Sequence, residues 1–328
     1  MLFTNVLDII EDDIQAYESS LLGVLLKDRT TRKNIIWATD NYIGNGDAFL
    51  PECEIVPEII TGEYSKLIQP RIAKAVETQG TRTKTHAEVF TPSWICNQQN
   101  NLMDAEWFGR ENVFNYQDGE RWEQTTNLIE FADSGKKTWK KYVDAKRLEI
   151  TCGEAPYIVS RYDTVTGETI PIANRIGILD RKLRVVNENT STIEDWLFWT
   201  KRAYQATYGY EFQGDNLLLA RENLLITYFD YFLDKFKINP PKDSVMEIAR
   251  IISWNMWQMD GLKGVVPYSC VPYIEEEYTL FGTNYYEHPC PGCEKEDLFK
   301  HTGVYCKVFD WRENASQLFV SIMKGANS

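Results

Sequence analysis

The sequence predicts a mixed α/β protein built around a parallel sheet, with a helical region before the sheet and an irregular segment after it. Two short strand-like segments, which begin near Arg147 and Thr207, each end in a glutamate. The first is followed by the tight turn TCGEAP and an apolar segment, and the second by a long segment with helical periodicity. Strands, turns and helices in this order are typical of a doubly wound sheet.

Length and composition allow one large α/β domain with additions, or two domains. The chain has 328 residues, of which 43% are hydrophobic, so it can bury a sizeable core. No segment approaches the ~18 consecutive apolar residues of a membrane span, and the N-terminus lacks the basic start and cleavage site of a signal peptide. Together with seven cysteines, interpreted as reduced thiols, these features predict a cytoplasmic protein without a membrane partner.

The net charge argues against a nucleic-acid-binding protein that acts alone. The chain carries 35 basic and 48 acidic residues, a formal net charge of −13. Phosphate contacts need clustered lysine and arginine, which supply most non-specific affinity for nucleic acid. If the protein works on DNA, another component is expected to supply much of the binding energy.

We predict three regions along the chain: 1–80, 81–265 and 266–328. The first is expected to be mostly helical with a loop-rich centre, because apolar residues recur at helical spacing. The third is expected to be irregular and to offer a partner interface, with one strand at 304–311. The residues that carry the N-terminal periodicity are Leu7, Ile10, Ile14, Tyr17 and Leu21.

The central region is predicted element by element. Residues 104–146 suggest irregular surface structure with a short helix near KTWKKYVDAKR. Residues 163–186 alternate and contain TVTGET, which predicts a β-hairpin. Helices are expected over 191–205, from Asp215 onward with Asp215 or Asn216 as the N-cap, and over 245–262 with an exit turn.

Three segments in a fixed order, AEVFTPSWICN, LEITCGEAPYI and YGYEFQGDNLLLARENLL, predict a site for a nucleoside-bearing cofactor. Such a cofactor binds at the carboxyl ends of the strands of a doubly wound sheet. The turn after the first strand must allow close backbone approach, and Gly153 and Ala155 would leave room. A carboxylate that ends the next strand, here Glu211, can accept two hydrogen bonds from a ribose diol.

On these residues the chain resembles S-adenosylmethionine-dependent DNA adenine-N6 methyltransferases of restriction–modification systems, specifically the type IIG-like group. It is also similar to proteins described as restriction endonuclease subunit M. The resemblance covers roughly residues 80–265 and implies a Rossmann-like methyltransferase sheet with S-adenosylmethionine as cofactor. It implies cofactor contacts at Phe90, Thr91 and Pro92 for the methionine end, at Glu149, Cys152, Gly153 and Ala155 in the loop, at Glu211 for the ribose, and at Asp260 for the adenine.

The chain departs from this family at the catalytic loop. The family holds a flipped adenine with Asn/Asp-Pro-Pro-Tyr/Phe, but here Asn239-Pro240-Pro241 is followed by Lys242 and suggests a helix-ending turn. In the family the catalytic strand would follow the region around 305–319, near where the sequence ends at Ser328. The resemblance therefore implies a split enzyme. A partner chain would carry the Asn-Pro-Pro-Tyr loop and the target-recognition domain, and this chain would meet DNA only through the complex.

Two other functions stay open from the sequence. One is a binding or regulatory protein that keeps a degenerate methyltransferase fold without cofactor, which the alanine at position 155 and the missing catalytic loop favour. The other is a methyltransferase that acts on RNA or protein. The position of the Phe-Thr-Pro segment ahead of the loop argues against this second alternative.

A cysteine- and histidine-containing segment near the C-terminus suggests a structural zinc site. A Cys-x-x-Cys knuckle with a later histidine and cysteine can supply four tetrahedral ligands, here Cys290, Cys293, His301 and Cys306. The alternative is a Pro/Gly turn that carries two ordinary thiols. A second cluster, the four basic residues of RIGILDRKLRVV, suggests either a phosphate contact or the solvated face of a hairpin.

Overall fold

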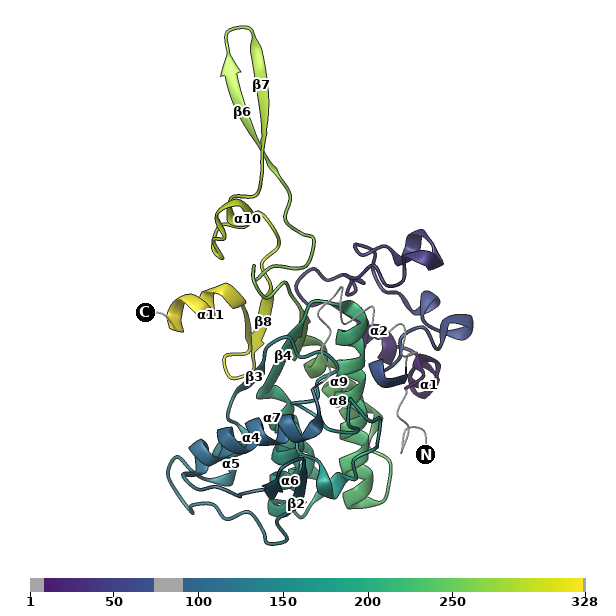
Figure 1. The fold of residues 1–328 in the computed structure, drawn as a ribbon, viewed down its shortest axis with the longest axis vertical. Coiled ribbons are helices and arrows are strands. Elements are labelled where there is room, and N and C mark those ends of the chain that lie inside the picture. The colour runs from purple at the N-terminus through teal and green to yellow at the C-terminus, as the bar shows by residue number, and fades with distance from the viewer. Residues whose placement is uncertain (1–8, 74–90, 327–328) are drawn as a thin grey trace.

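The computed structural model describes residues 9–73 and 91–326, and it confirms the mixed α/β class (Figure 1). At its centre is a parallel sheet of three short strands in the order β3-β4-β5. These strands are β3 (Arg147–Glu149), β4 (Thr207–Glu211) and β5 (Met256–Gln258). Because all three run in the same direction, their carboxyl ends meet at one edge of the sheet, which we call the carboxyl edge.

Helical crossovers connect the strands, as parallel pairing requires. The helices between β3 and β4 are α6 (Ile178–Asn189) and α7 (Ile193–Gln205). Those between β4 and β5 are α8 (Gly214–Phe236) and α9 (Lys242–Asn255). Sequence reasoning extended the last helix to residue 262, but the structure ends it at Asn255 and continues directly into β5.

The two faces of the sheet pack against different parts of the chain. Residues of β4 that alternate with Tyr210, such as Gly209, face the loop after β3 and the helices. Tyr210 and Trp257 face the opposite way and form a small second core with the C-terminal segment. The remaining members of this core are Met259, Val266, Cys306 and Val308.

Within residues 9–73, the N-terminal region contains less helix than the sequence predicted; Leu7 lies outside the described residues. Two short helices, α1 (Glu11–Tyr17) and α2 (Leu21–Leu26), pack in the same core as α8 and α9. The rest of this region, up to residue 73, is connected by single 3-10 turns. These are η1 (Ile43–Asn45), η2 (Asp47–Phe49), η3 (Pro57–Ile59), η4 (Gly62–Tyr64) and η5 (Arg71–Ala73).

Residues 104–146 are more regular than predicted. A 16-residue helix, α4 (Ser93–Phe108), runs into this segment, and a hairpin of β1 (Asn115–Asp118) and β2 (Arg121–Gln124) follows it. The short helix expected near KTWKKYVDAKR is confirmed as α5 (Trp139–Val143), whose N-cap Thr138 accepts a hydrogen bond from the backbone of Lys141.

The predicted hairpin over 163–186 is wrong. TVTGET does form a turn, closed by backbone hydrogen bonds between Asp163 and both Gly167 and Glu168. It leads to an isolated bridge between Tyr162 and Thr169 rather than to a hairpin of two strands, and the second half of the segment is helix α6. Its four basic residues do not form the solvated face of a hairpin, because each has a partner within the fold. Arg175 pairs with Asp230 and Arg181 with Asp104, both at 2.5 Å. The Lys182 ammonium donates to backbone oxygens, and the partly exposed Arg184 pairs with Glu188 at 2.8 Å.

The C-terminal segment contains a projecting hairpin rather than irregular structure alone. Strands β6 (Tyr273–Thr279) and β7 (Gly282–His288) extend away from the body of the molecule, with the short helix α10 (Pro291–Lys295) at their base (Figure 1). The strand expected within 304–311 is confirmed as β8 (Lys307–Asp310), which pairs with β9 (Ala315–Leu318) before α11 (Phe319–Ala326). No helix in the described part of the chain is long and apolar enough to cross a bilayer.

Candidate functional site

The carboxyl edge of the sheet brings together most of the residues that the sequence predicted for a cofactor. Glu149 ends β3 and Glu211 ends β4, and the loop after β3 folds back between them. The backbone N–H of Gly153 donates a hydrogen bond of 2.9 Å to Glu211 Oε2. The first predicted loop and the second predicted carboxylate are therefore in direct contact.

The loop after β3 has the backbone of a glycine-rich turn. Thr151, Gly153 and Ala155 all adopt left-handed conformations, with φ of 50°, 54° and 67°. At Gly153 a Cβ atom would meet nothing within 4 Å, so this part of the backbone faces open space and a ligand can approach it closely.

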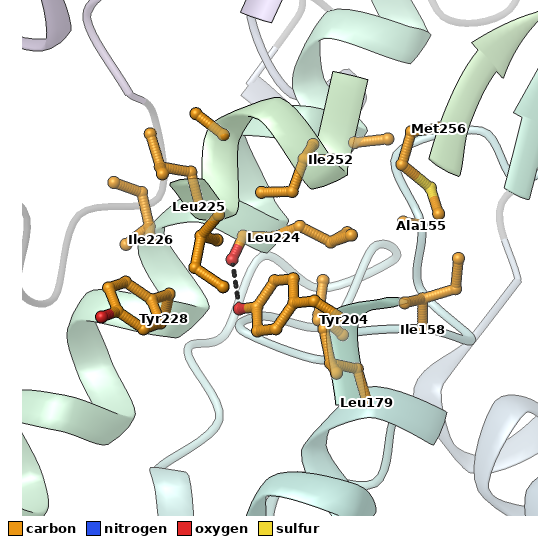
Figure 2. Packing of buried hydrophobic residues seen from close by; sticks show 14 of the residues in the cluster. Ala155, Ile158, Leu179, Tyr204, Leu224, Leu225, Ile226, Tyr228, Ile252 and Met256 are labelled. Atoms are coloured by element: carbon orange, nitrogen blue, oxygen red, sulfur yellow. Dashed lines mark hydrogen bonds between the residues drawn. The ribbon is translucent and has the colours of Figure 1, made fainter. Parts of the chain in front are cut away.

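Ala155, which the resemblance aligns with a second glycine, points the other way. Its side chain is fully buried and belongs to the main core with Ile158 and Met256 (Figure 2). The methyl group therefore does not occupy the open side of the loop. A left-handed alanine still costs roughly 1–2 kcal/mol relative to the right-handed conformation, and its burial among apolar residues offsets part of that cost.

Glu211 is a buried carboxylate with limited spare acceptor capacity. Burial raises its pKa, while hydrogen bonds from the backbone N–H groups of Gly153, Gln213 and Phe212 act in the opposite direction. The charge of Arg71 also lowers this pKa. An ionised carboxylate has about four lone-pair sites, so about one of them can still accept a hydrogen bond from a ligand.

Glu149 lies in a less polar environment, and burial raises its pKa to about 7. The charge of Glu149 contributes to the raised pKa of three neighbouring groups. These are the thiols of Cys96 and Cys152 and the hydroxyl of Tyr157. A cationic ligand group placed beside Glu149 would stabilise its ionised form.

The Phe-Thr-Pro segment, which directly precedes α4, is linked to the same edge through this helix. Thr91 and Pro92 directly precede this helix, and the thiol of Cys96 in its first turn lies beside Glu149. The backbone oxygen of Thr91 accepts a hydrogen bond of 2.8 Å from the hydroxyl of Thr164. Phe90 lies outside the described residues.

Asp260 and the Asn-Pro-Pro segment occupy different positions from the other predicted residues. Asp260 follows β5, at the same edge, but its carboxylate accepts hydrogen bonds from the backbone of Leu262 and Lys263 and pairs with the Lys263 ammonium at 3.3 Å. Asn239 lies in the turn between α8 and α9, at the far end of α8 from Glu211. It is a helix-ending turn, as expected.

A second candidate site lies at the base of the projecting hairpin, where four residues could hold a metal ion. Cys270, Cys290, Cys293 and His301 place one ligand atom each within 4.8 Å of one another. His301 Nδ1 lies 3.6 Å from each of the three sulfur atoms. With metal–sulfur and metal–nitrogen distances of about 2.3 and 2.0–2.1 Å, a tetrahedral zinc site has a nitrogen-to-sulfur separation of about 3.5–3.6 Å.

The backbone around these four residues is shaped for close approach. A Cβ atom on Gly292 would lie 2.6 Å from the ring and backbone of His301, so only glycine fits within the Cys-Pro-Gly-Cys turn. The pKa of Cys290 is lowered to about 5, because hydrogen bonds from Thr302, Cys293 and His301 outweigh the effect of burial. Burial and its neighbouring thiols raise the pKa of Cys270 to about 12. Three sulfur atoms this close together can all be ionised only if a cation lies between them.

This cluster corrects one predicted ligand and adds another. Cys306 is buried in the second core, where its Sγ atom lies 3.3 Å from the backbone oxygen of Gln258, and it does not belong to the cluster. Cys270 takes its place. The signal that could have identified Cys270 is the alternating segment YIEEEYTLFGTNYYEH, since a hairpin there returns the chain from Cys270 to Cys290.

Neither a protein-family model, nor a curated protein sequence, nor a solved structure matches this chain.

The raised pKa of Glu149 predicts how stability depends on pH. Between about pH 4.5 and 7 the folded protein binds this proton more tightly than the unfolded chain does, so the free energy of unfolding should fall as pH rises and then level off. Replacing the residue, Glu149→Gln, should therefore stabilise the protein at pH 8 by about 1–3 kcal/mol and change little near pH 4.5. Urea denaturation at several pH values measures this. Glu123→Gln, at an exposed position of β2, is the control, and identical profiles for both variants would contradict the prediction.

Proposed function

We propose that this chain is the S-adenosylmethionine-binding subunit of a split DNA adenine-N6 methyltransferase of a restriction–modification system. The observation that carries the proposal is the contact at the carboxyl edge between the Gly153 loop and Glu211. In a Rossmann-like sheet, a cofactor that contains a nucleoside lies across such a loop with its ribose on the carboxylate of the next strand. The strand order β3-β4-β5 agrees with this arrangement.

The residues at this edge fit the chemistry of the cofactor. The open side of Gly153 suits close approach of the ligand, and Glu211 keeps an acceptor site for a ribose hydroxyl. Glu149, with its pKa near 7, suits the positive charge of the sulfonium or ammonium group. The chain would contribute by holding and orienting the methyl donor and by excluding water.

We propose that the partner binds at the unpaired side of strand β3. In the described part of the chain β3 pairs only with β4, so its other side is an open edge. Leu148 and Ile150, beside this edge, leave 45% and 62% of their surface exposed. An open, apolar edge is suited to an added strand from another polypeptide. We propose that this polypeptide carries the Asn-Pro-Pro-Tyr loop and the basic DNA-binding surface that a chain with a net charge of −13 lacks.

We also propose that the cluster of Cys270, Cys290, Cys293 and His301 binds a structural zinc ion. Three thiolates and one imidazole are a common ligand set for closed zinc sites, and the measured separations fit tetrahedral zinc. The ion would fix the C-terminal segment, in which two of the four ligands come from the Cys-Pro-Gly-Cys turn.

Cofactor binding is the most direct test of the proposed function. The purified chain should release or absorb heat on titration with S-adenosylmethionine, and Glu211→Gln should weaken binding at least about tenfold, because an amide offers fewer acceptor sites to the ribose diol. Glu123→Gln, on the exposed face of β2, should bind like the natural chain. Absence of heat with the natural chain would favour the alternative, a methyltransferase-like fold that regulates or binds without cofactor.

The split arrangement makes a separate prediction. Co-expression with the product of the gene immediately downstream should give a complex that transfers a labelled methyl group to adenine N6 in DNA, whereas this chain alone should not. Leu148→Lys combined with Ile150→Lys should abolish the complex, because charged residues block strand addition at an edge. Leu102→Lys, at an exposed position of α4, is the matched control. Efficient methylation by the isolated chain would rule out the split enzyme.

The zinc assignment predicts one zinc ion per chain in protein purified in metal-free buffer. Inductively coupled plasma mass spectrometry measures this content. Cys270→Ser, Cys290→Ser and His301→Gln should each lose most of the metal, since a closed site needs all four ligands. Cys306→Ser should retain it, because this thiol lies outside the cluster. Retention by Cys270→Ser with loss by Cys306→Ser would show that the ligand set is wrong.

A further inference from the structure

The hairpin of residues 273–288, which we call the arm, is the most exposed element of the described structure. It consists of β6 and β7 joined by Leu280 and Phe281, and it points away from the sheet and the helices (Figure 1). Each strand has seven residues, so the arm extends about 24 Å. Every residue of β6 and most residues of β7 are exposed, so neither face of the arm packs against the body.

A hairpin in this position is not stabilised by its own packing. An isolated two-stranded hairpin is at best marginally stable in water, because it has no third strand or helix to cover an apolar face. The arm compensates only in part, through cross-strand contacts such as the stacked rings of Tyr273 and His288 and the hydrogen bond of 3.0 Å from Tyr286 to Glu277. A further surface that covers the arm would add the missing layer.

The tip and sides of the arm carry residues that are typical of interface contacts. Leu280 and Phe281 are fully exposed at the tip. Tyrosines at positions 278, 285 and 286 lie along the strands and are also exposed. Exposed aromatic residues in one compact element commonly supply the centre of a protein interface.

The charge of the arm determines which class of partner fits it. Residues 273–288 contain four glutamates and no lysine, arginine or aspartate. Nucleic acid and anionic membrane surfaces would be repelled. A second copy of this chain would bring another strongly acidic surface, since the net charge is −13. A protein with a basic rim around an apolar pocket is complementary to both the tip and the glutamates.

The base of the arm connects it to the metal-binding cluster. Cys270 precedes β6 and Cys290 follows β7, and both sulfur atoms lie 3.6 Å from His301 Nδ1. A metal ion held there would fix both ends of the hairpin to the same point. Its direction relative to the body would then be defined before a partner is met, which lowers the entropic cost of binding.

We propose that the arm is a docking element that inserts Leu280 and Phe281 into an apolar pocket of a protein with a basic rim, and that the cluster at its base fixes its direction. The second half of this proposal rests on the proposed zinc site. The first half rests only on the exposure and charge of the arm, and it does not depend on the cofactor or on the split enzyme.

The experiment introduces the photo-crosslinker p-benzoylphenylalanine in place of Phe281 in the full chain, in cells that naturally contain the protein. The same amino acid in place of Tyr116, which is exposed on the β1–β2 hairpin, is the control. Mass spectrometry identifies the adduct and the peptide on which it forms. We expect one protein, crosslinked at a basic surface, from position 281 and not from position 116. Replacing the four glutamates by glutamine should reduce this adduct at least about fivefold.

The other outcomes separate the two halves of the proposal. An adduct with a second copy of the chain, with nucleic acid or with lipid would overturn the docking proposal, as would equal yields from both positions or no adduct at 281. A glutamate-dependent adduct in a chain without zinc would retain the docking and reject the metal. If zinc is present, Cys290→Ser should reduce the adduct, and an unchanged yield would show that the metal does not direct the arm.

Discussion

One constraint shapes this structure: α8 is buried through most of its length and still carries charged side chains that need partners. Arg221 lies in the first half of α8 and is fully buried. It donates hydrogen bonds to the backbone oxygens of Leu25 and Met256. Nearer the end of α8, Asp230 forms an ion pair with the guanidinium of Arg175. A buried polar group without a partner costs about 1–3 kcal/mol, and a charged group costs more. The N-terminal region, the segment before α6 and the start of β5 must therefore all meet this helix in defined positions.

The same helix determines where the candidate cofactor loop lies. The side-chain amide of Asn223 donates a hydrogen bond of 3.1 Å to the backbone oxygen of Glu154. The carboxylate of Glu154 accepts hydrogen bonds from the hydroxyl of Tyr162 at 2.6 Å and from the backbone of Arg71 at 2.7 Å. These contacts hold the loop from three sides while the backbone of Gly153 stays open. A loop fixed in this way needs little reorganisation to receive a ligand, which is the property that a binding loop requires.

The sequence predicts features whose signal is local and misses those that depend on distant partners. The strands that end at Glu149 and Glu211 and the turn at Gly153 follow from a few adjacent residues, and the structure contains all three. The basic residues Arg175 and Arg181 were assigned to a solvated hairpin or a phosphate contact, because their carboxylate partners lie 55 and 77 positions away. Burial of an ion pair cannot be recognised from one of its members. Likewise, Cys270 joins the metal-binding cluster only once the hairpin that separates it from Cys290 is known.

The small second core packs the C-terminal segment, which carries the metal-binding cluster, against the sheet, which carries the carboxyl edge. Cys306, which was predicted as a ligand, instead packs with Tyr210 and Trp257 on the face of the sheet opposite the helices, and its sulfur contacts the backbone of Gln258 in β5. The neighbouring Val265 bridges to both Asp260 and the segment that leads into β8. The C-terminal segment is thus attached directly behind the carboxyl edge. The chain that leads to the base of the arm therefore starts from buried contacts with the sheet, at Val266.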